Sequence, residues 1–195
     1  MNFQQKLTFP ISYIHTQKDI NECTNFAESI DTSHYASRSQ TDPEKRKRDQ
    51  IVGKLGELCV YNVLKNQFPD ITYPDFNIYK AKDKSWDFDL KASGLNLHVK
   101  SQDVLQGKKY GISWIFQASN GRRDYDKEIF DKLSPNQKIA FVSVDMVAKQ
   151  SILQAIVDLD ILHDKKLFKL PKVFKLQNAN KLAVYFDDLK VIGDI

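Results

Sequence analysis

The sequence predicts an α/β protein with a central mixed β-sheet of about five strands flanked by helices. Three observations predict this class: one long segment has apolar residues at helical spacing, several later segments alternate apolar and polar residues, and the long helix precedes the strands. The length of 195 residues suits a single core domain, expected at 41–195, preceded by an N-terminal arm at 1–40.

Composition excludes several classes of protein. Hydrophobic residues make up 42% of the chain and aromatic residues 11%, enough to fill a core, so disorder is excluded. No window approaches the roughly eighteen consecutive apolar residues of a membrane span, and no apolar secretion signal follows Met1. Two cysteines are too few for a disulfide framework and favour reduced thiols in the cytoplasm. A net charge of +4 permits a polyanionic partner without identifying one.

The arm at 1–40 is mixed in composition and is expected to be irregular, with a short helix near 20–30. A long helix is then expected from about Pro43 to Asn66. Thr41 or Asp42 can cap it, and Pro43 suits its first turn. Apolar residues at helical spacing give it a core-facing stripe: Ile51, Val52, Leu55, Leu58, Cys59 and Val63.

A β-hairpin is predicted after this helix. Apolar and polar residues alternate over 88–92 and over 95–102, and Ser93-Gly94 between them suits a two-residue turn. In that register Leu90 lies opposite Leu97. One face is therefore apolar, and the other gathers the polar side chains of Asp87, Asp89, His98, Lys100 and Gln102. Taken alone, a sheet with one solvated face explains this pattern equally well.

Further elements complete the predicted fold. Strands are expected at 111–117, 138–144, 152–157 and 182–186, and short helices at 124–133 and 159–168.

Glu57 is the least expected residue of the long helix. It lies opposite the main stripe, among apolar neighbours such as Val60 and Leu64, where a carboxylate either reaches solvent or is held for a purpose. Gly53 and Gly56 flank it, each costing about 1 kcal/mol of helix stability relative to alanine. Small residues here allow another backbone to come close, as in a helix packed tightly onto a sheet.

Together these residues resemble the PD-(D/E)xK nuclease superfamily, which has the restriction-endonuclease-like fold. The resemblance covers roughly 52–117 and rests on Gly53-Lys54-Leu55-Gly56-Glu57 in the helix, Asp89 on one strand and His98-Val99-Lys100 on the next. It implies a restriction-endonuclease-like core.

The resemblance also implies an activity: hydrolysis of phosphodiester bonds in double-stranded DNA by a Mg²⁺-dependent endonuclease, with Mn²⁺ as a substitute. A type II restriction endonuclease, or a catalytic subunit of one, is the leading interpretation, acting as a homodimer or with a heteromeric partner. A repair or recombination nuclease would share the same residues. A nuclease-fold protein that has lost catalysis and only binds DNA is another alternative, and a mixed-sheet domain with an unrelated small-molecule site is the last.

Each candidate residue then has an implied role. Asp89 would be the principal metal ligand, Glu57 would hold a water on the ion or a second ion, and Lys100 would orient the attacking water and stabilise developing charge. Gln102 would hydrogen-bond the water or a phosphate oxygen.

His98 departs from the family pattern, because Asp or Glu usually stands two residues before the lysine. Histidine subtracts one negative charge from a site built for Mg²⁺. His98 is a metal ligand or water-orienting group, or Asp87 or Gln102 supplies the missing oxygen, or the site is inactive.

DNA-binding residues are expected in two places. Arg122 and Arg123 follow a predicted strand, and Lys108-Lys109 follow the predicted active strand. The basic run 45–48 is interpreted as a solvated helix face. The remaining histidines show no metal-ligand spacing and are interpreted as structural: His15, His34 and His163.

Overall fold

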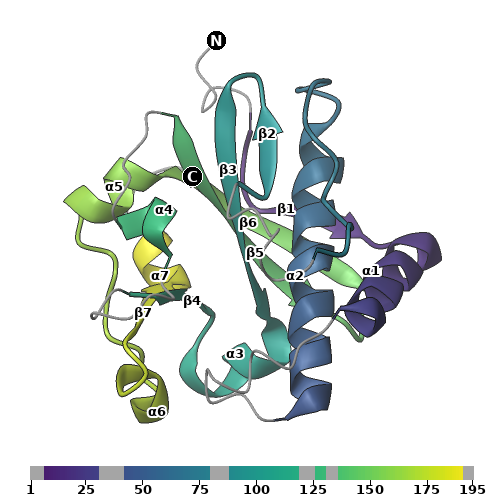
Figure 1. Cartoon of the computed structure of the whole chain (residues 1–195). Helices are drawn as coiled ribbons and strands as arrows, with labels where there is room; N and C mark the ends of the chain where they lie inside the picture. The colour runs from purple at the N-terminus through teal and green to yellow at the C-terminus, as the bar shows by residue number, and fades with distance from the viewer. Residues whose placement is uncertain (1–6, 31–41, 80–87, 119–125, 131–135, 191–195) are drawn as a thin grey trace.

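A computed structural model describes residues 7–30, 42–79, 88–118, 126–130 and 136–190 of the chain. Its centre is a five-stranded mixed sheet flanked by helices, which confirms the α/β class (Figure 1). The strands lie in the order β1 (Ile11–Ile14), β6 (Gln150–Asp158), β5 (Gln137–Asp145), β3 (Leu95–Asp103) and β2 (Leu90–Ala92).

The predicted hairpin is confirmed with its register. Leu90 pairs with Leu97, and the turn residues Ser93 and Gly94 have φ values of +46° and +77°. Two consecutive residues with positive φ match the twist of the flanking strands and make a tight turn. Beyond the hairpin, β3 continues to Asp103 and pairs in parallel with β5.

The long helix α2 (Pro43–Leu64) covers one face of the sheet. The Asp42 side chain caps it by accepting a hydrogen bond from the Lys45 backbone, and Pro43 occupies its first turn, as expected. Its apolar stripe packs against one face of the hairpin and of β5, where Leu55, Leu97 and Val142 are buried in one cluster.

The segment 11–29 is more regular than expected. β1 pairs antiparallel with β6, and α1 (Gln17–Ser29) buries Cys23 and Ala27 in the core. The prediction of a short helix near 20–30 is confirmed by α1, whereas the strand β1 was not expected in an otherwise irregular arm. A four-residue strand is too short to show a clear alternation, so only its partner β6 identifies it.

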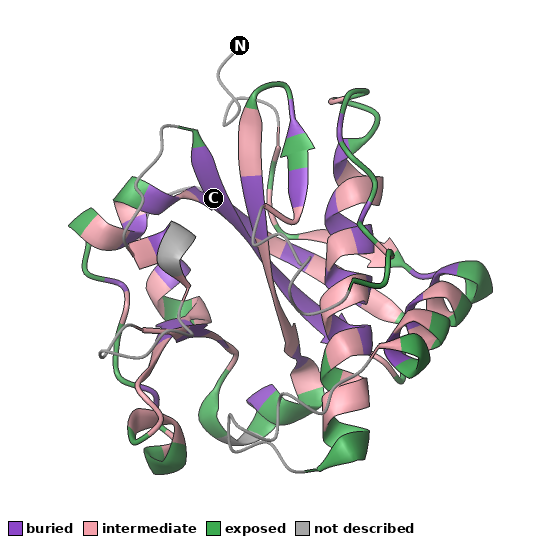
Figure 2. Cartoon of the chain, in the orientation of Figure 1, coloured by how far each residue is buried: buried purple, intermediate pink, exposed green. Residues whose placement is uncertain are grey.

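A second layer covers the other face of the sheet. β4 (Ser113–Gln117) and β7 (Lys181–Tyr185) form a separate two-stranded sheet rather than joining the central one. Between the layers lies a second buried cluster that includes Trp114, Phe116 and Phe141 (Figure 2). The Trp114 indole donates a hydrogen bond to the Val142 carbonyl at 2.9 Å, which joins the two sheets.

Short helices complete the fold. α4 (Lys127–Phe130) lies within the helix expected at 124–133, whose remaining residues are described only at Asp126, and α5 (Leu159–Asp164) is shorter than expected. Three helices were missed by the pattern: α3 (Val104–Tyr110), α6 (Phe174–Gln177) and α7 (Phe186–Leu189). Elements of four to seven residues contain at most two helical turns, so periodicity cannot reveal them.

Candidate active site

The two faces of β3 separate the predicted residues. Leu97 and Val99 face α2 and belong to its apolar cluster. Because side chains alternate along a strand, Lys100 projects from the opposite face, where its Nζ lies 4.9 Å from the centroid of the Phe116 ring. Lys100 therefore meets the second layer, and α2, which carries Glu57, lies on the opposite face of β3.

Asp89 lies at the start of the edge strand β2. Its Oδ2 accepts a hydrogen bond from the backbone N–H of Val99 at 2.7 Å. This bond occupies a donor of β3 just beyond the last ladder pairing of β2. It also brings the Asp89 carboxylate to β3 at the residue between His98 and Lys100.

Glu57 is held inside the molecule on α2. Its side chain is 12% exposed, and Oε2 accepts a hydrogen bond from Lys54 Nζ at 2.6 Å. Burial and, next in size, the Asp89 carboxylate raise the pKa of Glu57 to about 8, against the opposing effect of Lys54. The electrostatic effect of Asp89 on Glu57 means that the helix and the hairpin bring these two carboxylates into one neighbourhood.

Lys54, the ion-pair partner of Glu57, also contacts two aromatic rings. Its Nζ lies 5.1 Å from the ring centroid of Phe26 in α1 and 5.4 Å from that of Phe76. The pKa of Glu57 stays raised despite its 2.6 Å ion pair with Lys54, because burial, which is the largest effect, and the Asp89 carboxylate together outweigh the lysine.

Lys100 has a partner that the sequence did not suggest. Its Nζ lies 3.0 Å from Asp126 Oδ2, and the same oxygen accepts a hydrogen bond from the Gln117 backbone at 3.1 Å. Asp126 directly precedes α4, within a segment expected to be an ordinary helix. No short-range pattern links it to β3, because their contact depends on β4 folding over the sheet.

His98 and Gln102 share the face of Lys100. The His98 side chain is buried, and its ring centroid lies 4.9 Å from that of Phe88. Gln102 Nε2 donates a hydrogen bond to the Asp103 carbonyl at 3.1 Å. Asp87, the alternative oxygen donor, lies outside the described residues.

The number and type of the candidate ligands decide whether a hard cation such as Mg²⁺ fits them. Among the residues that the structure describes, no three side chains of His, Cys, Asp or Glu form a metal-binding group. Mg²⁺ commonly binds through only one or two protein carboxylates and takes its other ligands from water and substrate phosphate. The Glu57–Asp89 neighbourhood fits that donor set.

The helix approaches β3 closely beside Glu57. A Cβ built on Gly56 would lie 1.8 Å from Ser101 Oγ and 3.0 Å from Ser101 Cβ, so a larger residue requires the serine or the helix to shift. At Gly53 nothing lies within 4 Å of such a Cβ, so the expected close approach holds for Gly56 alone.

The basic run at the start of α2 consists largely of paired side chains. Lys45 pairs with Asp49, Lys47 with Glu28, and Arg48 with Asp103, at 2.9, 2.6 and 2.6 Å. This agrees with a solvated helix face. Of the other expected DNA contacts, Lys108 is exposed on α3 and Lys109 follows it in the same helix, whereas Arg122 and Arg123 lie outside the described residues.

Two of the three remaining histidines have structural partners. His15 Nε2 lies 2.6 Å from Ser151 Oγ in the core, and His163 Nε2 lies 2.9 Å from the Ile129 carbonyl oxygen. His34 lies outside the described residues. Both cysteines are free and buried.

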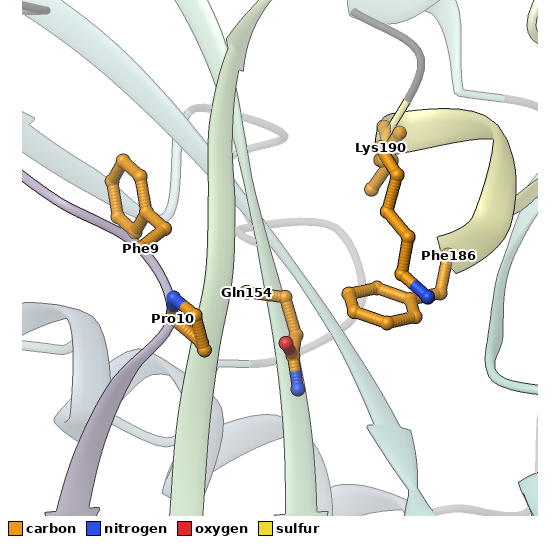
Figure 3. Close-up of a pocket in the computed structure, with 6 residues that line it drawn as sticks. Phe9, Pro10, Gln154, Phe186 and Lys190 are labelled. Carbon is orange, nitrogen blue, oxygen red and sulfur yellow. The ribbon is translucent and has the colours of Figure 1, made fainter. Parts of the chain in front are cut away.

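A surface hollow of about 260 Å³ lies elsewhere, between the chain entering β1 and helix α7 (Figure 3). Its lining residues are Phe9, Pro10, Gln154, Phe186, Leu189 and Lys190. None of the predicted site residues lines it, and its mostly apolar walls offer little to a phosphate.

Comparisons with protein-family models, curated proteins and solved structures give no match to this chain. Among the helices that the structure describes, none has the length and apolar character needed to cross a membrane.

Proposed function

We propose that this chain is a metal-dependent DNA endonuclease of the cytoplasm that hydrolyses phosphodiester bonds, as a type II restriction endonuclease or a catalytic subunit of one. The observation that carries the proposal is geometric: Asp89 accepts a hydrogen bond from the Val99 N–H of β3 at 2.7 Å, and Gly56 brings α2, with the buried Glu57, against the same strand at Ser101. Two carboxylates in a region of low dielectric repel each other and are costly to ionise. A divalent cation between them would remove that cost, whereas Lys54 only reduces it.

Glu57 and Asp89 would hold the ion. When bound, Mg²⁺ supplies positive charge for the scissile phosphate and makes water a better nucleophile at neutral pH. Asp89 is prepared for this role because the Val99 N–H fixes one carboxylate oxygen and leaves the other for a ligand. The proposed metal site therefore uses two carboxylates and does not require an acidic residue at the position of His98.

Lys100 would act on the phosphate and on the attacking water from the face of β3 that points away from α2. Since Glu57 lies on α2, the amine would have to reach an ion held by Glu57 and Asp89 around the edge of β3 that Asp89 contacts through the Val99 N–H. Asp126 holds the amine in this structure, and a phosphate oxygen would compete with that carboxylate for the ammonium hydrogens. Exchange of Asp126 for substrate would bring the charge of Lys100 to the reaction.

Incubation of the purified chain with plasmid and phage DNA, with and without Mg²⁺ or Mn²⁺, followed by mapping of the ends, tests the proposal. Lys100→Ala, Asp89→Asn and Glu57→Gln are expected to abolish cleavage and to leave DNA affinity intact. Lys91→Ala, which removes an exposed lysine of the same hairpin, is the control and should cleave normally. Full activity of Lys100→Ala would reject the assignment.

A second candidate function, DNA binding without catalysis, is favoured by one observation. Both Lys100 and Glu57 are engaged in ion pairs with other side chains of the chain, Asp126 and Lys54. Metal titration separates the two candidates. A protein without catalysis should bind Mn²⁺ no better than its own Asp89→Asn variant, whereas a nuclease should bind it measurably better.

The mapped ends also separate restriction from repair. Cuts at a fixed sequence in both strands support a restriction enzyme, and cuts confined to branched or mismatched DNA support a repair nuclease. With one site in each chain, cleavage of both strands calls for a homodimer or a partner subunit, which sedimentation on DNA would reveal.

A further inference from the structure

Positive charge is concentrated in the last part of the chain. Residues 165–190 contain seven lysines and two aspartates, a net charge of +5, whereas the whole chain carries +4. The rest of the molecule is therefore close to neutral. A polyanion approaching the protein would be drawn towards this segment, which forms α6, β7 and the loops around them.

Part of this segment contacts the end of α3. Lys172 Nζ lies 4.0 Å from the position of a Cβ on Gly111, the residue that ends α3. Lys172 is fixed in place by Tyr185, whose hydroxyl accepts a hydrogen bond from the Lys172 backbone at 2.6 Å and whose ring lies 4.7 Å below Nζ. Figure 1 shows α3 and α6 both below β4, and Lys172 lies between them, close to the end of α3.

This surface combines lysines with exposed rings. Lys108, Lys172 and Lys175 are exposed, and none of them pairs with a carboxylate of the described part of the chain. Phe174 is 72% exposed between Lys172 and Lys175, and Tyr110 is 37% exposed at the end of α3. We call these five residues the α3–α6 surface.

We propose that the α3–α6 surface binds the phosphate backbone of DNA that extends from the candidate active site. Lysine ammonium groups neutralise phosphates, and exposed aromatic rings stack on bases or sugars. This inference rests on the proposed function, because it assigns a path to the same DNA. The sequence analysis predicted that Lys108 contacts DNA. It made no such prediction for Lys172, Phe174 or Lys175.

The distance between the surface and Lys100 suits a nucleic acid. β4 starts next to the α3–α6 surface, and Phe116 near its other end contacts Lys100. From Ser113 to Phe116 the strand covers three steps, roughly 10 Å at about 3.3 Å each. One strand of B-DNA covers that length in about three nucleotides. A single DNA segment could therefore contact both places.

The test measures binding separately from cleavage. The full chain is titrated against a fluorescently labelled DNA duplex in EDTA, at several salt concentrations, with anisotropy as the readout. The test variant carries Lys108→Gln, Lys172→Gln and Lys175→Gln. The control carries Lys18→Gln, Lys65→Gln and Lys149→Gln, three exposed lysines elsewhere on the molecule. Both variants lose the same charge, and thermal unfolding verifies that both fold.

Each lost phosphate contact lowers the slope of log affinity against log salt concentration by about 0.9. In the test variant we expect the magnitude of this slope to fall by about 2 to 3 and the affinity for DNA to fall at least tenfold at moderate salt. In the control variant the slope and the affinity should be unchanged. Phe174→Ala is expected to weaken binding without changing the slope, because stacking releases no counterions.

Several results would overturn the proposal. Equal losses in the test and control variants would mean that only net charge matters, and no loss in either would place the DNA elsewhere. Loss of binding to anionic lipid vesicles, with DNA binding unchanged, would assign the surface to a membrane.

The outcome is distinguishable from failure of the proposed function. DNA binding that depends on the α3–α6 surface, without cleavage under any metal, rejects the nuclease and keeps the surface. If the test variant cleaves DNA and binds it with full affinity, the DNA-binding role of the α3–α6 surface is rejected and the nuclease function stands.

Discussion

Lys100 of the central sheet forms an ion pair with Asp126, the residue before α4, with 3.0 Å between Nζ and Oδ2. The pair links β3 to the second layer, because the same Asp126 oxygen accepts the Gln117 N–H. Both side chains are roughly one-quarter exposed, so solvent screens part of their attraction.

A double-mutant cycle with Lys100→Met and Asp126→Asn measures this link. We expect a coupling free energy of about 0.5 to 1 kcal/mol in urea unfolding, typical of a partly exposed ion pair. A coupling indistinguishable from zero would show that the pair contributes nothing to the fold. Asp126→Ala should cost more than Asp126→Asn, because it also leaves the Gln117 N–H without its acceptor.

Gly56→Ala tests the contact between α2 and β3. The new methyl group would lie 1.8 Å from Ser101 Oγ and 3.0 Å from Ser101 Cβ, so the serine must rotate and the helix or strand must give way slightly. We expect a net loss of about 1 to 2 kcal/mol, since overpacking exceeds the gain of about 1 kcal/mol in helix propensity. The matched control is Gly53→Ala, which has open space around it and should be neutral or stabilising. Equal effects of the two substitutions would contradict the close approach.

Glu57 should make the fold less stable as pH rises. Its pKa is about 8 in the folded protein against an ordinary value of 4.5, so the unfolded chain releases this proton first. The group lowers stability progressively between these two pH values, with a slope of at most about 1.4 kcal/mol per pH unit. Urea unfolding at a series of pH values should therefore show a flatter profile for Glu57→Gln. An unchanged profile would mean that Glu57 is ionised in the fold.

His15 should make the fold less stable as pH falls, the opposite of the effect of Glu57. Burial lowers its pKa below the ordinary 6.5, and Asp19 only partly opposes this. Near pH 6.5 the unfolded chain binds a proton on His15 that the folded chain does not bind. The free energy of unfolding therefore falls as pH decreases through about 6.5. His15→Gln should remove this acid-side loss. The measurement is the same unfolding series below pH 7, and a parallel decline in the variant would assign the loss to other groups.

The sequence predicted the parts of the site that depend on local pattern. The helix stripe, the Ser93-Gly94 turn and the pairing of Leu90 with Leu97 follow from spacing and turn chemistry, and the structure confirms each. The unusual position of Glu57 was also visible, because an acid among apolar helix residues conflicts with its own surroundings. The roles of Glu57 and Asp89 in binding a metal stay predictions.

The missed features depend on contacts between distant segments. Nothing near Asp126 in the sequence indicates that it pairs with Lys100, and nothing near Lys172 indicates the end of α3. β4 and β7 were predicted as strands, but their separation into a second sheet was not, because alternation specifies a strand and leaves its partner open.

By itself, then, the amino-acid order determined the helix, the hairpin and the acids and amines that they carry, because backbone propensity and side-chain alternation act over a few residues. Only the tertiary structure decided which charges of different elements interact: Glu57 with Asp89, and Lys100 with Asp126. Burial and Coulomb energy depend on distance in space, and the packing of two layers on one sheet sets those distances.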